Sequence, residues 1–84
     1  MRVLVAVASR HGSTHEIAEA IANEVRTAGL DADLSDADDV TSVAEYDALI
    51  IGSAVYMGGW MPEAKRFVER FRAQLIAMPV WLFS

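Results

Sequence analysis

The sequence contains no cysteine, few basic residues and no long apolar run. Without cysteine the chain forms no disulfide and offers no thiolate, so any redox activity requires a bound cofactor. Seven basic against twelve acidic residues give a formal net charge of −5. This charge argues against nucleic-acid or anionic-membrane partners, because both need a basic surface. No apolar stretch approaches the roughly 18–20 residues of a membrane span. The short apolar start also lacks a signal-peptide cleavage pattern, which predicts a cytoplasmic protein.

Hydrophobic residues, in contrast, make up 54% of the 84 positions, which predicts elements buried on more than one face. A chain of this length supplies one domain or part of one. Residues 3–8 and 48–51 are continuous apolar runs, typical of central parallel strands that helices cover on both faces. Residues 31–34 alternate polar with apolar and predict a half-exposed edge strand. Residues 80–83 predict a fourth strand.

Two segments carry apolar residues at helical spacing. The first spans residues 14–28 and stops at Gly29; its apolar face consists of Ile17, Ala18, Ile21, Ala22 and Val25. The second follows Pro62 as one long helix that Pro79 ends; its stripe consists of Ala64, Phe67, Val68, Phe71 and Leu75. Residues 36–39 predict a solvated acidic loop, and residues 40–45 one or two helical turns. This order predicts a parallel sheet with helices on both faces.

Residues 9–14 join the first strand to the first helix, at the edge where open α/β sheets bind ligands. Gly12 lets the backbone approach an anion, and the helix start adds unpaired N–H groups. Three residues near Gly12 in the sequence add hydroxyl donors: Ser9, Ser13 and Thr14. Neither the P-loop pattern nor the dinucleotide fingerprint is present, which disfavours a nucleoside triphosphate or NAD. The motif indicates a phosphate loop; the alternative is that these residues only cap the helix.

Several neighbouring residues allow two interpretations. Arg10 either neutralises the phosphate or is a surface arginine. His11 either hydrogen-bonds the phosphate or shuttles protons, or is simply exposed, which is the favoured interpretation; His15 is interpreted as a surface residue. Three large side chains follow the third strand and either wall a bound ring or pack over the end of the sheet: Tyr56, Met57 and Trp60. The acidic residues Asp36, Asp38 and Asp39 are interpreted as a solvated loop, so we expect no metal. No catalytic triad or other catalytic residue is identified.

Both loops resemble those of the flavodoxins. The segment Ala-Ser-Arg-His-Gly-Ser-Thr at 8–14 is similar to their phosphate loop, and Gly-Ser-Ala-Val-Tyr-Met-Gly at 52–58 to their second flavin loop. With Trp60 and the closing residues 80–84, the whole chain resembles the menaquinone-dependent protoporphyrinogen oxidases and their actinobacterial flavodoxin-domain relatives. The resemblance implies a flavodoxin-like α/β fold of three layers with a parallel sheet of four strands in the order 2-1-3-4. Residues 1–84 would be the N-terminal part of a single domain whose C-terminal strand and helices are missing.

The resemblance implies FMN as the cofactor and a two-electron oxidoreductase that takes electrons from a porphyrinogen and passes them to a quinone. It implies that the phosphate rests on the first loop, at Ser9, Arg10, His11, Gly12, Ser13 and Thr14. It implies that the isoalloxazine ring lies beside the second loop, at Ser53, Ala54, Val55, Tyr56, Met57 and Gly58. The family's third flavin loop, after the fourth strand, has barely begun at Ser84.

Two alternatives belong to other functional classes. An electron-carrier flavodoxin would dock a basic redox protein with its acidic face, in a salt-sensitive manner. A fragment that no longer binds FMN would purify colourless and would associate with a second copy through the exposed strand Val80–Phe83.

Overall fold

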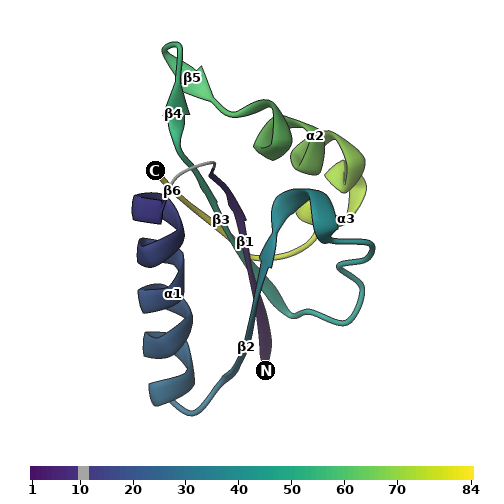
Figure 1. Cartoon of the computed structure of the whole chain (residues 1–84). Helices are drawn as coiled ribbons and strands as arrows, with labels where there is room; N and C mark the ends of the chain where they lie inside the picture. The colour runs from purple at the N-terminus through teal and green to yellow at the C-terminus, as the bar shows by residue number, and fades with distance from the viewer. Residues whose placement is uncertain (10–11) are drawn as a thin grey trace.

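The computed structural model describes residues 1–9 and 12–84, with the backbone but not the side chain of Tyr56. Four parallel strands form the main sheet in the order β2-β1-β3-β6. Their bounds are Arg2–Ala8 for β1, Asp31–Asp36 for β2, Ala48–Ser53 for β3 and Val80–Phe83 for β6. Figure 1 shows this sheet between helices. The α/β fold, the predicted strand order and the edge position of β2 are confirmed.

Helices cover both faces of the sheet (Figure 1). On one face, α1 (Gly12–Thr27) contributes Ala18 and Ala22 to a buried cluster with Val5 and Val7 of β1. On the other face, α2 (Pro62–Arg70) and α3 (Arg72–Ile76) lie over a second cluster that includes Phe67. Residues 3–8 are at most 4% exposed, because β1 packs against side chains on both of its faces. This double burial explains why the strand is continuously apolar.

The helix starts and stops follow local chemistry in most places. Gly29 takes φ 91°, the left-handed conformation that glycine adopts most readily after a helix. Pro62 opens α2, where its missing N–H costs nothing. The single long helix predicted after Pro62 is wrong, since the backbone of Phe71 leaves the helical region at φ −109° and ψ 19°. The Phe71 side chain is buried there, with its ring centroid 5.0 Å from that of Phe67.

The segment between β2 and β3 also differs from the prediction. Residues 36–39 are not only a loop, because Ala37–Asp39 forms the short 3-10 helix η1. Residues 40–45 form no helix; they run irregularly, with a turn at residues 44–45. Val40 and Val43 are both buried in the cluster beneath α2. Tertiary burial of these two side chains, together with the low helix propensity of β-branched residues, outweighs the local pattern.

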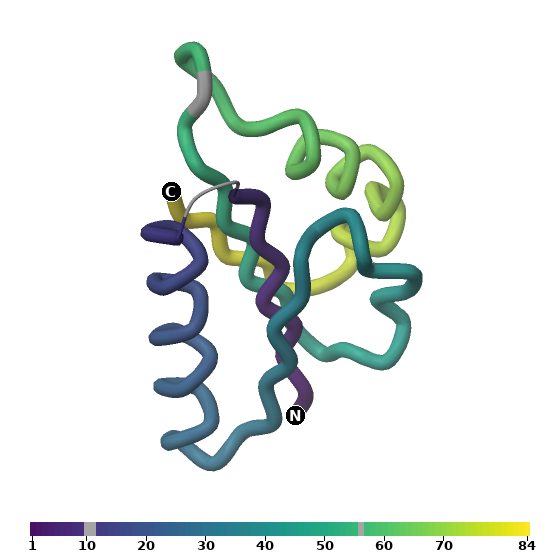
Figure 2. Tube along the Cα trace, viewed as in Figure 1, coloured from purple at the N-terminus to yellow at the C-terminus, as the bar shows by residue number. Residues whose placement is uncertain are grey.

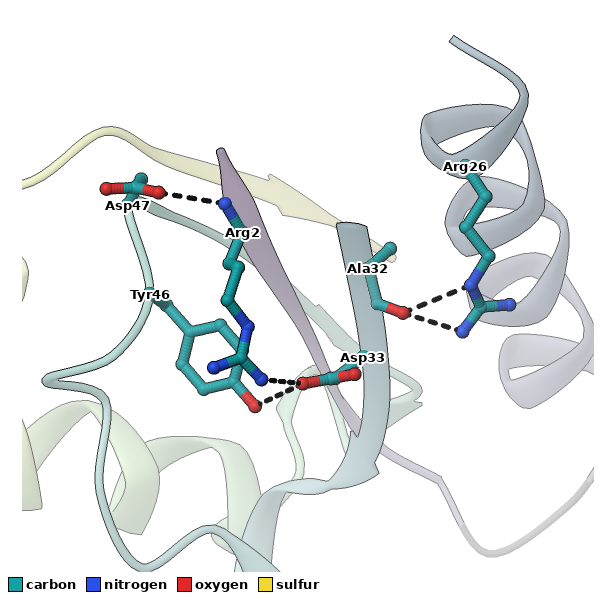
Figure 3. A network of polar contacts seen from close by, with 6 residues as sticks. All are labelled: Arg2, Arg26, Ala32, Asp33, Tyr46 and Asp47. Atoms are coloured by element: carbon teal, nitrogen blue, oxygen red, sulfur yellow. Dashed lines mark hydrogen bonds and ion pairs between the residues drawn. The ribbon is translucent and has the colours of Figure 1, made fainter. Parts of the chain in front are cut away.

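A polar network joins the amino-terminal part of the sheet to the segment before β3 (Figure 3). Arg2 Nη2 and the Tyr46 hydroxyl each donate to Asp33 Oδ2 at 2.8 Å, and the Arg2 amide donates to Asp47 Oδ2 at 2.8 Å. The hydrogen bond from Tyr46, reinforced by Arg2, lowers the pKa of Asp33. Burial, followed by the hydrogen bond to Asp33, raises the pKa of Tyr46 to about 12.

The Cα trace in Figure 2 shows the carboxyl terminus at the same end of the molecule as the start of α1, with the amino terminus at the other end. This follows from the parallel sheet, since β1 begins and β6 finishes at opposite edges. Within the described part of the chain, no helix has the length and apolarity needed to cross a bilayer.

Candidate functional site

The carboxyl ends of β1, β3 and β6 meet at one edge of the sheet. The strand register pairs Ala8 with Ser53 and Gly52 with Phe83. Just beyond the strands, the Ala54 amide donates a hydrogen bond to the Ala8 carbonyl at 2.9 Å. The two segments that sequence analysis singled out therefore start side by side, and the chain after β6 starts beside them.

The predicted phosphate loop leads directly into α1. Ser9 is half-buried, Gly12 and Ser13 are exposed in the first helical turn, and Thr14 is buried. That turn lies within the described residues and contains no acidic residue, so its free N–H groups keep their partial positive charge. Arg10 and His11 lie outside the described residues. The described donors are amides and hydroxyls, which suit an anion such as a phosphate.

Gly12 provides a test of whether this loop fits a phosphate. Among the described residues, a Cβ at this position would meet only Glu16 Oε1, at the ordinary contact distance of 3.7 Å. The described residues therefore leave space beside the Gly12 backbone, where a ligand has room to approach. The one close neighbour is a carboxylate, so the phosphate contacts would come from the amides and hydroxyls of the loop.

The second predicted loop contains an antiparallel hairpin of β4 (Val55–Tyr56) and β5 (Gly59–Trp60), which projects beyond the sheet (Figure 1). Met57 and Gly58 form its turn with φ 50° and 81°. Val55 is 68% and Met57 89% exposed, an unusual position for two large apolar side chains. Trp60 is half-buried against the cluster beneath α2, which supports the packing interpretation of this residue.

Ser53, the last residue of β3, is fully buried beneath this hairpin. Its hydroxyl accepts a hydrogen bond from the Met61 amide and donates one to the Ala54 carbonyl, both at 2.9 Å. Ala54 itself is half-buried against the core. Among the predicted ring contacts whose side chains the structure describes, Val55, Met57 and Gly58 are exposed and accessible to a ligand; the side chain of Tyr56 lies outside the described residues.

On the other side of β1 lies an acidic cavity of about 210 Å³, which sequence analysis missed. Ser9 lines it together with four acidic residues, Asp36, Asp38, Asp39 and Glu63. The run of acidic residues after β2 was the available signal, but the contribution of Glu63 depends on the placement of α2. Since carboxylates repel phosphate, an anion bound at this edge belongs on the β3 side of β1.

His15 is at the surface, as expected, but it has acidic neighbours. Its Nδ1 lies 3.5 Å from Glu19 Oε1, and its Nε2 lies 3.8 Å from Asp36 Oδ1. Even so, no group of three or more histidine or acidic residues is arranged to hold a metal ion within residues 1–9 and 12–84.

Comparisons with known proteins agree with this geometry. A family model described as a flavodoxin domain matches residues 4–84. Protoporphyrinogen IX dehydrogenase (quinone) from Escherichia coli strain K12 is 28% identical over 86 aligned residues, covering 100% of this chain and 48% of that protein. The chain thus spans about half the length of the curated relatives it matches.

Solved structures show the same fold. A flavodoxin from the domain Archaea has a TM-score of 0.80 at 25% identity, covering 92% of this chain and 53% of that one. The flavodiiron protein from Giardia intestinalis has a TM-score of 0.83 at 22% identity, covering 99% of this chain and 23% of that one.

Proposed function

The chain belongs to the flavodoxin domain family, and from this premise we propose that it binds FMN and takes part in redox chemistry. One observation carries the proposal. A loop rich in hydroxyl and amide donors and an apolar hairpin start side by side, at the edge where parallel sheets bind cofactors, through the pairing of Ala8 with Ser53.

We assign the FMN phosphate to the loop after β1: Ser9, Arg10, His11, Gly12, Ser13 and Thr14. The start of α1 offers N–H donors and a positive dipole end, and the glycine position is open to a ligand. The acidic cavity on the β2 side repels the phosphate and so favours its placement toward β3.

We assign the ring to the loop after β3: Ser53, Ala54, Val55, Tyr56, Met57 and Gly58. Val55 and Met57 expose apolar surface that a planar aromatic ring would remove from water. Of the described side chains in this loop, those of Val55 and Met57 are exposed and would orient the ring and keep water from one side of it, whereas the Ser53 side chain is buried and would act through the loop. The phosphate loop would supply most of the polar contacts.

Bound FMN supplies two-electron transfer, which this cysteine-free chain does not provide by itself. The specific reaction that we propose is of the protoporphyrinogen dehydrogenase type. A porphyrinogen would lose two electrons and two protons, and a quinone would gain them as a quinol. The similarity to the Escherichia coli dehydrogenase across the whole chain supports this assignment.

An electron-carrier role is the second candidate, and the charge distribution favours it. Asp36, Asp38 and Asp39 are exposed beside the same edge of the sheet, in a chain of net charge −5. An acidic surface beside the cofactor site would attract a basic redox protein and would do so less strongly at high salt.

A titration of FMN with the purified chain, followed by quenching of flavin fluorescence, tests the cofactor assignment. We expect saturable quenching that is lost in Gly12→Asp, because the new carboxylate repels the phosphate. Ala20→Asp is the matched control, since it adds the same charge to the exposed side of α1 away from the loop. The absence of quenching by the unmodified chain would overturn the proposal and favour a fragment that no longer binds FMN.

The two redox roles are then separated with the FMN-loaded chain. The dehydrogenase assignment predicts consumption of protoporphyrinogen with a quinone as acceptor. The carrier assignment instead predicts electron exchange with a flavodoxin reductase that slows as the salt concentration rises, and no consumption of porphyrinogen.

A further inference from the structure

Ser53 is a buried polar side chain at the carboxyl end of a central strand. It is 0% exposed, and its neighbours in β3 are apolar. A buried hydroxyl is costly unless it is hydrogen-bonded, so a small apolar residue would be the simpler choice for packing alone. Ser53 Oγ uses both its donor and its acceptor function within the chain, toward the Ala54 carbonyl and the Met61 amide. We call these two hydrogen bonds the Ser53 bridge.

The Ser53 bridge joins the two ends of the hairpin segment. Ala54 begins that segment and is also bonded to Ala8 of β1. Met61 follows it, is 2% exposed, and is the N-cap residue of α2, where no side chain provides a cap. Both ends of residues 54–60 are therefore fixed at one buried point, between the sheet and the first turn of α2.

The tip of the hairpin is constrained as well. Met57 and Gly58 both have positive φ, as a two-residue turn between antiparallel strands requires. With the turn and the base both constrained, the backbone that carries Met57 has a defined position relative to the ends of β1 and β3. Loss of the bridge would release the base of the hairpin. It would also leave the buried Met61 amide and the partly buried Ala54 carbonyl without this hydrogen-bond partner.

We propose that Ser53 is a positioning residue: its hydroxyl presets the hairpin 54–60 for the cofactor and does not itself contact the cofactor. The inference rests on the proposed FMN function. Full burial prevents the hydroxyl from reaching a ligand at the surface, and its hydrogen bonds act instead on the residues that can. A hairpin held in place before binding loses less conformational entropy when the ring docks, and this raises affinity.

Amide hydrogen exchange on the FMN-free chain tests the bridge by itself. In Ser53→Ala we expect the Met61 amide and the hairpin amides to exchange about tenfold faster relative to those of β1, the factor expected for one ordinary hydrogen bond. Val5→Ala is the matched control, because Val5 is equally buried but lies at the centre of β1, in the cluster beneath α1 and not in the one that contains Met61. Ser53→Thr keeps the hydroxyl and should restore protection. Unchanged exchange of Met61 in Ser53→Ala would overturn the bridge.

FMN titration of the same variants tests the positioning role. We expect Ser53→Ala to raise the dissociation constant about tenfold, while Ser53→Thr and Val5→Ala stay within about twofold of the unmodified chain. Faster hairpin exchange in Ser53→Ala without weaker FMN binding would overturn the positioning role. If the unmodified chain binds no FMN, the proposed function fails and the positioning role fails with it, while the exchange experiment still reports whether the bridge holds the hairpin.

Discussion

The two outer strands of the sheet are built differently. β2 carries Asp31 and Asp33 on its exposed positions, and Arg26 of α1 donates from Nε and Nη2 to the Ala32 carbonyl at 3.0 and 2.8 Å. Figure 3 shows this carbonyl pointing toward Arg26. β6 is entirely apolar in sequence, and its Trp81 and Leu82 are 56% and 64% exposed. A further strand would meet charge at β2 and only apolar side chains at β6.

The contrast with β6 shows how an outer strand is protected from pairing with a further strand. Charged side chains and a side-chain cap on the backbone protect β2 from further strand pairing. Beside β6, an apolar cavity of about 420 Å³ adds to the unprotected surface; its lining includes Ile21, Val25, Ile50 and Phe83. Four variants test what individual residues contribute to the stability or pairing of these two outer strands. They follow from the largest expected effect to the smallest.

Gly52→Ala should loosen the attachment of β6. A Cβ at Gly52 would lie 2.0 Å from Phe83 Cζ, so the ring of Phe83 has to move away. Overpacking of this kind costs about 1–3 kcal/mol in the free energy of unfolding, measured by urea denaturation. Gly59→Ala is the control, because its nearest described neighbour is the flexible end of Lys65 at 3.7 Å. If both variants are equally stable, the packing of the Phe83 ring against Gly52 does not contribute to stability.

Leu82→Lys should reduce self-association through β6. The unpaired apolar edge is expected to pair with the same edge of a second copy, and a lysine there should raise the dissociation constant of the dimer about tenfold. Sedimentation velocity over a range of concentrations measures this. Ile76→Lys makes the same exchange at an exposed residue of α3, outside the edge, and should leave association unchanged. A chain that is monomeric throughout the range would contradict the expectation.

Arg26→Ala should destabilise the β2 edge by about 1 kcal/mol, because the Ala32 carbonyl loses both of its guanidinium donors. Arg72→Ala removes an equally long side chain, which forms an exposed ion pair with Glu69 at 3.8 Å, and it should cost close to nothing. Urea denaturation of the two variants decides the point. Equal losses would mean that the cap on β2 contributes no more than a surface ion pair.

Tyr46→Phe should lower stability by about 0.5–1 kcal/mol near neutral pH, through loss of the hydrogen bond to Asp33. The raised pKa of Tyr46, about 12, means that its contribution is present below an ordinary tyrosine pKa of about 10 and is lost between there and 12. The lowered pKa of Asp33 means that its contribution is present above about pH 4 and is lost in more acidic solution.

The difference between the unmodified chain and Tyr46→Phe should therefore be largest between these limits. Denaturation at pH 3, 7 and 11 measures it, and Asp33→Asn with the double variant completes a mutant cycle. A difference that stays constant from acid to alkaline pH would show that the hydrogen bond to Asp33 does not contribute.

Much of the fold was predictable from local patterns. The strand runs, the stop at Gly29 and the position of both loops at strand ends depend on residues close together in the sequence. Two helix predictions failed, at residues 40–45 and across Phe71, where burial of Val40, Val43 and Phe71 outweighs local propensity. Residues 54–61 are predicted from the sequence as a loop, whereas the structure pairs β4 with β5 in a hairpin within this segment, which was not foreseen.

The sequence by itself determined which segments form the sheet, where the loops after β1 and β3 begin, and that any redox chemistry would need a bound cofactor. Only the tertiary structure decided that Arg26 caps the edge strand β2, that Ser53 is buried with its hydroxyl both donating and accepting a hydrogen bond, and that carboxylates gather on one side of β1. The physical reason is that these features join residues far apart in the chain, such as Arg2 with Asp33 and Ser53 with Met61. Their contacts depend on how the helices and strands pack, whereas apolar runs and turns depend on residues that are adjacent in the sequence.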